Sequence, residues 1–95
     1  PAKREMACGA SGIQQQTLNV SCENKGSAYA QVREIVLKQG ERVLGRFEGG
    51  AYILPGARKA MPVKLEGALP GGRLQLGVTY DDGRSDAFEV TVGGR

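Results

Sequence analysis

Histidine and tryptophan are both absent from this chain of 95 residues. Histidine is the commonest general base and a frequent metal ligand, so its absence removes the usual starting point for catalysis. We therefore expect no enzymatic activity, no bound metal and no cofactor. Aromatic residues make up only 5% of the chain, and the basic residues alternate with acids to leave a net charge of +3. Because nucleic-acid binding usually needs a clustered basic face with stacking aromatics, we expect no nucleic-acid partner.

Long apolar runs are also missing. None approaches the roughly 20 residues that a membrane-spanning helix needs, and no signal peptide is recognisable, so we expect no membrane insertion. The chain begins with Pro1 and not with methionine. This start is expected of a mature or excised fragment whose targeting information lies upstream. The length fits one domain, and we predict an N-terminal strand or linker segment over 1–14 and a β-sandwich over 15–95.

What the chain does contain is alternation of apolar and polar residues with a period of two, broken by turn residues among its 15 glycines. This pattern predicts an all-β protein, an immunoglobulin-like β-sandwich of about seven strands. The expected strands cover Lys3–Cys8, Gln15–Glu23, Ala28–Gln39, Arg42–Phe47, Tyr52–Leu54, 58–66, 74–80 and 88–92. A helix over 28–38 is the competing interpretation of the third segment, but β-branched residues favour a strand there.

Irregularities in the pattern predict where the strands bend and end. The inward-facing set of the third strand changes parity between Val32 and Ile35, which predicts a β-bulge at Arg33 and Glu34. The glycines of 9–12 and 49–50 are expected to end the strands that precede them. Asp81, Asp82 and Gly83 predict a hairpin turn before the last strand, whose Phe88 is expected to face the core. Pro62 is expected at a sheet edge or bulge.

The segment Ala51–Arg58 is the most informative stretch of the chain. A short apolar strand ends in Pro55-Gly56, and a basic strand leaves the turn. Proline fixes φ at the second position of a type II turn, and glycine supplies the positive φ that the third position requires. Loops on a rigid sandwich usually carry recognition. The candidate partner-contact residues are therefore Tyr52, Leu54, Arg58 and Lys59.

Cys8 and Cys22 are the only cysteines. An even count in a small β domain is typical of a disulfide formed in an oxidising compartment, and we predict that these two are bonded. The alternative is that both are free thiols buried as small hydrophobic residues. Asp81, Asp82 and Asp86 gather around one turn, but their spacing does not match a calcium-binding loop, and a solvated hairpin turn is the better interpretation.

Two stretches of the chain, Leu18–Val32 and Gly50–Lys59, resemble the second domain of PapD-like periplasmic pilus-assembly chaperones, in particular the archaic, Csu-like branch. The first stretch contains an Asn-x-Gly turn between two strands, and the second contains a Tyr-x-Leu-Pro-Gly corner. The closing hairpin over 74–92 also fits that domain, so the resemblance covers nearly the whole chain. The motifs consist of turn residues and include no catalytic signature.

This resemblance implies a periplasmic, or otherwise secreted, ATP-independent and non-catalytic protein. Such chaperones bind pilus subunits by strand addition and present them to an outer-membrane usher. The donor strand and the basic cleft residues belong mainly to the first domain of the family, so they are not transferred to this chain. Pilus subunits and the usher are the partners that the resemblance implies.

Two functions of other classes also fit the sequence. The first is a stand-alone secreted or surface immunoglobulin-like module that binds a protein. The second is a small inhibitor or accessory protein, for which Gly49–Ala57 would be the inserted loop. An exposed edge strand would also allow the isolated domain to form an edge-paired or swapped homodimer.

Overall fold

The computed structural model describes residues 5–92, and within them the chain forms seven β-strands and no helix. All paired strands are antiparallel, in the order β1-β2-β5-β4-β3-β6-β7. The strands are β1 (Met6–Gln14), β2 (Thr17–Asn24), β3 (Ala30–Gln39), β4 (Arg42–Ile53), β5 (Arg58–Leu65), β6 (Gly72–Tyr80) and β7 (Ser85–Val92).

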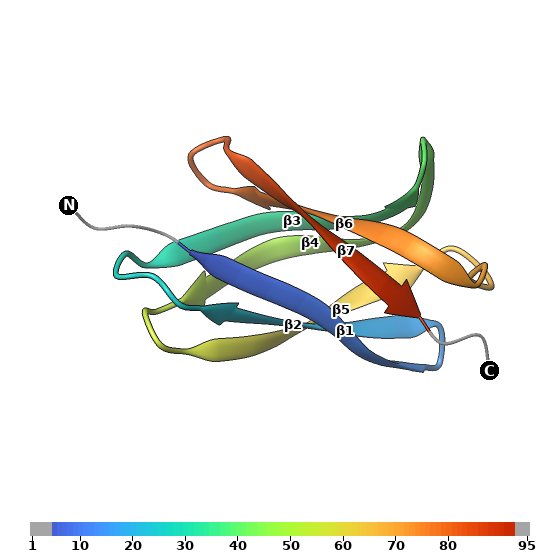
Figure 1. The fold of residues 1–95 in the computed structure, drawn as a ribbon, viewed down its shortest axis with the longest axis horizontal. Helices are drawn as coiled ribbons and strands as arrows, with labels where there is room; N and C mark the ends of the chain where they lie inside the picture. The colour runs from blue at the N-terminus through green and yellow to red at the C-terminus, as the bar shows by residue number, and fades with distance from the viewer. Residues whose placement is uncertain (1–4, 93–95) are drawn as a thin grey trace.

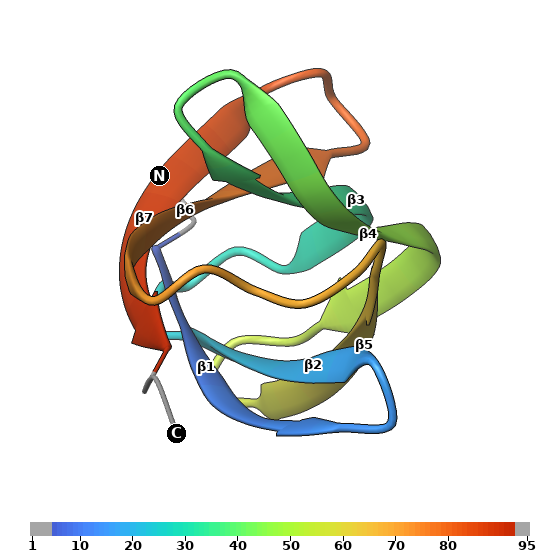
Figure 2. The ribbon, with the colours of Figure 1, turned by 90° about the vertical axis from the view of Figure 1, so that its right-hand side faces the viewer.

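The sheet folds back on itself into two layers (Figures 1 and 2). One layer holds β1, β2 and β5, and the other holds β4, β3, β6 and β7. The layers are joined by pairing only at Gly45–Leu65 and Arg46–Lys64, between β4 and β5. On the opposite side β1 and β7 lie side by side, but they are not neighbours in the hydrogen-bonded order. The predicted all-β sandwich is confirmed.

The core lies between the layers and follows the predicted alternation. Every second residue of β2 is buried, and β5 and β6 show the same pattern. The largest fully buried side chains are Tyr80, Leu18, Ile35, Leu37, Ile53, Met61, Leu74 and Leu76. Each such side chain contributes about 1.5–3 kcal/mol through the apolar area that it removes from water. Val90 of β7 is buried, but Phe88 is only partly buried, so the prediction of a core Phe88 was too strong.

The bulge predicted at Arg33 is confirmed. The pairing of β3 shifts between Val32 and Glu34 on both of its sides, against β4 and against β6. Val32 and Ile35 are therefore both buried, although they lie an odd number of residues apart. The bulge lets the residues of β3 that follow it, Ile35 and Leu37, face the core although the strand bends.

Two predicted strand ends were wrong, and the reason is the same in both. The glycine-rich segment of 9–12 lies within β1, where the register shifts between Ala10 and Gly12. The Gly49-Gly50 doublet lies within β4, which shifts against β3 at this point. In each case a β-bulge takes up the irregularity that the sequence pattern attributes to a turn. The first expected strand starts at Lys3, but Lys3 and Arg4 lie outside the described residues, and β1 begins at Met6.

The β1–β2 hairpin turn consists of Gln15 and Gln16, with φ values of 51° and 64°. Gln14 and Thr17 pair on either side, so the loop has two residues, both in the left-handed region that a type I′ turn requires. Residues other than glycine, asparagine and aspartate adopt this region at a cost. The turn is thus formed by residues that are poorly suited to it.

Replacing this turn with the favoured Asn-Gly pair should stabilise the protein. We expect the double substitution Gln15→Asn and Gln16→Gly to raise the free energy of unfolding by about 1 kcal/mol, because the strain is relieved at two exposed positions. Urea unfolding followed by circular dichroism measures the change. The double substitution Gln14→Asn and Thr17→Gly in the flanking strands serves as a control and should destabilise. A loss of stability in the turn variant would contradict the type I′ assignment.

Candidate interaction surface

Asn24 is the one fully buried polar residue identified among the described residues, and all its groups are used. Its side-chain Nδ2 donates to the carbonyl of Ala28 at 2.8 Å and to that of Ile53 at 2.9 Å. Its Oδ1 accepts the backbone N–H of Gly26 at 3.0 Å, which closes an Asx turn. Asn24 therefore joins the loop after β2 to the end of β4.

The backbone of Asn24 makes a second connection, to the turn between β4 and β5. Its N–H donates to the carbonyl of Ala57 at 3.0 Å, and its carbonyl accepts the N–H of Gly56 at 2.8 Å. Within that turn the N–H of Ala57 donates to the carbonyl of Leu54 at 2.9 Å, and Gly56 has a φ of 82°. The Pro-Gly turn predicted from the sequence is thus confirmed, and Asn24 holds it in place.

The segments fixed by Asn24 place three large apolar side chains in solvent. Tyr29, Tyr52 and Leu54 are 55%, 57% and 62% exposed, and the two tyrosine rings pack at a centroid distance of 5.7 Å. The carbonyl of Ile53, bonded to Asn24, lies between Tyr52 and Leu54 in the chain. The two loops concerned meet at one end of the sandwich (Figure 1). We call Tyr29, Tyr52 and Leu54 the aromatic corner.

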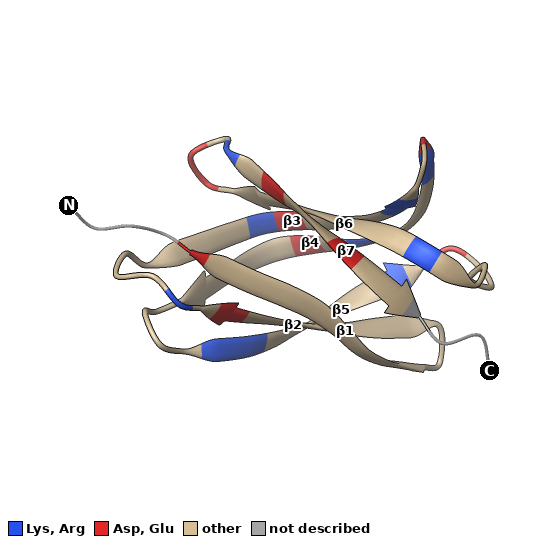
Figure 3. Ribbon diagram, viewed as in Figure 1, with Lys and Arg blue, Asp and Glu red and all other residues tan. Residues whose placement is uncertain are grey.

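The two basic candidates lie at the start of β5, directly after the Pro-Gly turn, and pair with β2. Arg58 is exposed and forms an ion pair with Glu23, its register partner on β2, with Nη2 3.1 Å from Oε1. Lys59 is exposed and pairs in register with Cys22. Because an exposed ion pair contributes only a little to stability, Arg58 stays available to a partner at small cost. Elsewhere both signs of charge are spread over the strands (Figure 3).

Two residues of this surface, Tyr29 and Asn24, were not predicted from the sequence. Tyr29 has the parity opposite to that of the buried Ala30, and this was a signal that its ring faces outward. Asn24 was interpreted only as a turn residue of an Asn-x-Gly motif. Its burial could not be read from the turn chemistry, because it depends on the end of β4, which is 29 residues further along the chain.

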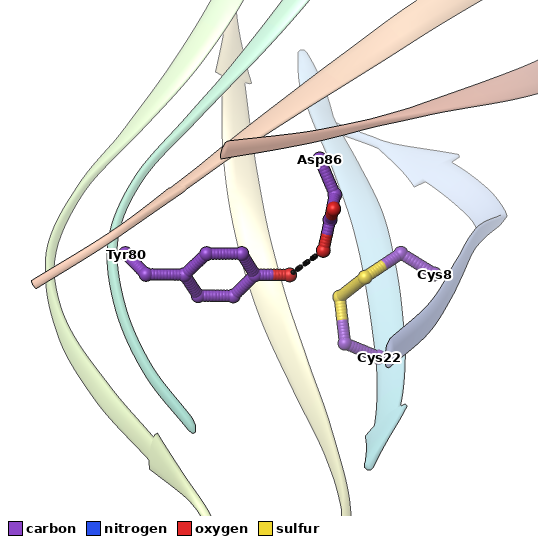
Figure 4. Close-up of a disulfide and its surroundings, with 4 residues drawn as sticks. All are labelled: Cys8, Cys22, Tyr80 and Asp86. Atoms are coloured by element: carbon purple, nitrogen blue, oxygen red, sulfur yellow. Dashed lines mark hydrogen bonds between the residues drawn. A yellow bond between two sulfur atoms is a disulfide. The ribbon is translucent and has the colours of Figure 1, made fainter. Parts of the chain in front are cut away.

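The predicted disulfide is present. Cys8 of β1 and Cys22 of β2 are direct register partners and are bonded, with their Cα atoms 4.1 Å apart. Figure 4 shows this bond beside the hydrogen bond that the hydroxyl of Tyr80 donates to Asp86, at 2.7 Å. Asp82 accepts the N–H of Arg84 within the β6–β7 turn, at 3.0 Å. Across residues 5–92, no three acidic, cysteine or histidine side chains gather in a way that could hold a metal ion.

Neither a protein-family model nor a curated protein sequence matches this chain significantly. Among solved structures, the fold is similar to that of the archaellum periplasmic stator protein FlaG from Sulfolobus acidocaldarius. The TM-score is 0.63, the match covers 90% of this chain and 99% of that chain, and the sequences are 11% identical. At this identity the likeness concerns the fold alone. Among the described residues, no helix is long and apolar enough to cross a membrane.

The expected membership of the PapD-like chaperones was wrong. The structural neighbour is an archaellum stator protein and not a pilus chaperone domain. The motifs behind the expectation were an Asn-x-Gly turn and a Leu-Pro-Gly corner, and the structure explains both by local geometry: one is an Asx turn and the other supplies a positive φ. Turn chemistry of this kind recurs wherever a sandwich needs the same turns, so it does not identify a lineage.

Proposed function

We propose that this chain is an extracytoplasmic, non-catalytic module that binds another protein through the aromatic corner. The single observation that carries the proposal is the gathering of Tyr29, Tyr52 and Leu54, each more than half exposed, on segments held by one buried asparagine. A small domain gains nothing in folding from exposing these side chains. Tyrosine is enriched where protein partners bind, since it offers a large contact area with few rotatable bonds.

The rigidity of the corner supports the same conclusion. Every hydrogen-bonding group of Asn24 is occupied, and the two tyrosine rings pack against each other. Side chains that are ordered before binding lose less conformational entropy when the partner docks. Arg58 and Lys59 add positive charge at the start of β5, directly after the turn that follows Leu54, which favours a partner that also carries acidic residues.

Two findings support the extracytoplasmic location. The Cys8–Cys22 disulfide is of the kind that persists in oxidising compartments. The structural neighbour is described as periplasmic, although its sequence is only 11% identical. The inhibitor alternative has less support, because most of Gly49–Ala57 belongs to β4 and does not form a free loop.

Site-specific photo-crosslinking tests the proposal. A photoreactive phenylalanine analogue replaces Tyr52 in the cells that produce the protein. The matched control carries the analogue at Gln75, an exposed residue of β6 near the Gly72 end of that strand. We expect a discrete adduct with one extracytoplasmic protein from position 52, reduced by Leu54→Ala and absent from position 75. Identical adducts from both positions, or none from position 52, would overturn the assignment of the binding surface.

A further inference from the structure

β4 and β5 are consecutive strands joined by a tight turn, yet they pair only far from that turn and lie apart between Arg46 and the turn. Their pairing is limited to Gly45–Leu65 and Arg46–Lys64. Continuing this register would place Phe47 opposite Val63 and Glu48 opposite Pro62. It stops because Pro62 has no N–H to donate and because β4 bulges at Gly49 and Gly50. We call this opening the β4–β5 fork.

A cleft of about 520 Å³ occupies the fork. It is lined by Arg46, Phe47, Glu48, Pro62, Lys64, Leu65 and Glu66. Phe47 packs against the core but is only partly buried, so its ring is a part of the apolar interior that can be reached from the cleft. Along the same edge, β4 beyond Arg46 has no partner strand on the β5 side. Free edge backbone of this kind is a template for another strand.

The charges around the fork have a definite order. Arg46 and Lys64 are exposed and lie directly opposite each other, an arrangement of like charges that is unfavourable between neighbouring strands. Glu34 relieves it in part, at 3.5 Å from Arg46. Glu48 follows two residues from Arg46 on β4, and Glu66 follows two residues from Lys64, directly after the end of β5. The exposed side of the fork thus presents an acid, a pair of cations and a second acid.

We propose that the fork binds an extended segment of a partner protein that carries the complementary pattern. In that segment a central acid lies between Arg46 and Lys64, and a base at the second residue on either side faces Glu48 and Glu66. The residue between the central acid and the base that faces Glu48 points the other way in a strand and is apolar, because it faces Phe47. The segment's backbone pairs with the free edge of β4 beyond Arg46, on the side that faces Glu48, and toward Glu66 it lies over the β4–β5 pair, whose backbone groups are already bonded. This site is separate from the aromatic corner and does not depend on it.

A short blocked peptide with the sequence Thr-Lys-Val-Glu-Val-Lys-Thr is the probe. It is titrated into the full ¹⁵N-labelled protein with the disulfide intact, and amide shifts are followed by NMR. We expect weak, saturable shifts confined to the amides of 46–48 and 63–66. The matched control is the charge-reversed peptide Thr-Glu-Val-Lys-Val-Glu-Thr, which should bind at least about fivefold more weakly, as expected for losing and reversing exposed ion pairs.

The variant Lys64→Glu provides the decisive comparison, since Lys64 is exposed and its replacement leaves the core intact. We expect this variant to lose about fivefold in affinity for the first peptide and to improve in affinity for the charge-reversed one. Equal binding of both peptides, shifts centred on Tyr29 and Tyr52, or no saturable shifts at all would overturn the fork as a strand-binding site. Success or failure of this experiment says nothing about the aromatic corner, because the two sites use different residues.

Discussion

Asn24→Ala should lower the free energy of unfolding by about 3–5 kcal/mol, a large part of the 5–15 kcal/mol that a domain of this kind possesses. The substitution removes both Nδ2 donors and the Oδ1 acceptor. It leaves the carbonyls of Ala28 and Ile53 without their partner, and each buried group that loses its hydrogen bond costs about 1–3 kcal/mol. Chemical unfolding measures the change, and Asn19→Ala in the middle of β2 serves as the matched control.

Asn24→Asp separates the hydrogen bonds from the shape of the side chain. The carboxylate still accepts from Gly26, but it places negative charge against two carbonyl oxygens in a buried site. Burial and these neighbours should raise the folded-state pKa of the new carboxyl above its unfolded value. The unfolded state then loses its proton first as the pH rises, so the variant should be least stable at neutral pH and should recover stability on acidification. A variant as stable as the wild type at neutral pH would contradict the role given to Asn24.

Gly45→Ala is the second large effect and should cost about 2–3 kcal/mol, in the range found for overpacked cores. A Cβ at this position would lie 2.8 Å from the carbonyl oxygen of Lys64 and 3.1 Å from side-chain atoms of Leu65 and Val63. The oxygen belongs to the backbone and cannot rotate away. Gly45 also forms one of the two register pairs that join the layers. If β4 and β5 move apart to relieve the clash, this pairing between the layers is weakened.

Gly77→Ala is the matched control for this effect. Gly77 lies on β6 and is partly buried, but a Cβ there would meet its nearest neighbour, the carbonyl oxygen of Val36, at an ordinary 3.9 Å. We expect Gly77→Ala to change the free energy of unfolding by less than about 1 kcal/mol. Equal losses for the two variants in urea titrations would show that the close approach at Gly45 does not limit stability.

The fold could be predicted from the sequence because the two-residue period is strong in β2, β5 and β6, where every second side chain is buried. The bulge at Arg33 could be predicted for the same reason, since it shifts the parity within one strand. The glycines of 9–12 and 49–50 were wrongly expected to end strands, because a bulge and a turn use the same residues locally and differ only in whether the partner strand continues. That depends on the pairing of β1 with β2 and of β4 with β3.

The candidate surface was predicted only in part. Tyr52 and Leu54 could be selected because they flank a recognisable turn, and the structure places both in solvent. Tyr29 and Asn24 contribute through contacts with the distant end of β4, and no local pattern reports such contacts. The resemblance to a chaperone family failed for a related reason. Short turn motifs record backbone geometry, and backbone geometry is shared by unrelated sandwiches.

The central claim is that the aromatic corner binds a protein partner, and the affinity of a corner variant for the crosslinked partner tests it most directly. The variant carries Tyr52→Ala and Leu54→Ala together, and isothermal titration calorimetry compares it with wild type and with Gln75→Ala. We predict that the corner variant binds at least about thirtyfold more weakly, corresponding to a loss of 2 kcal/mol or more, while its free energy of unfolding stays within about 1 kcal/mol of wild type. An unchanged dissociation constant would contradict the account.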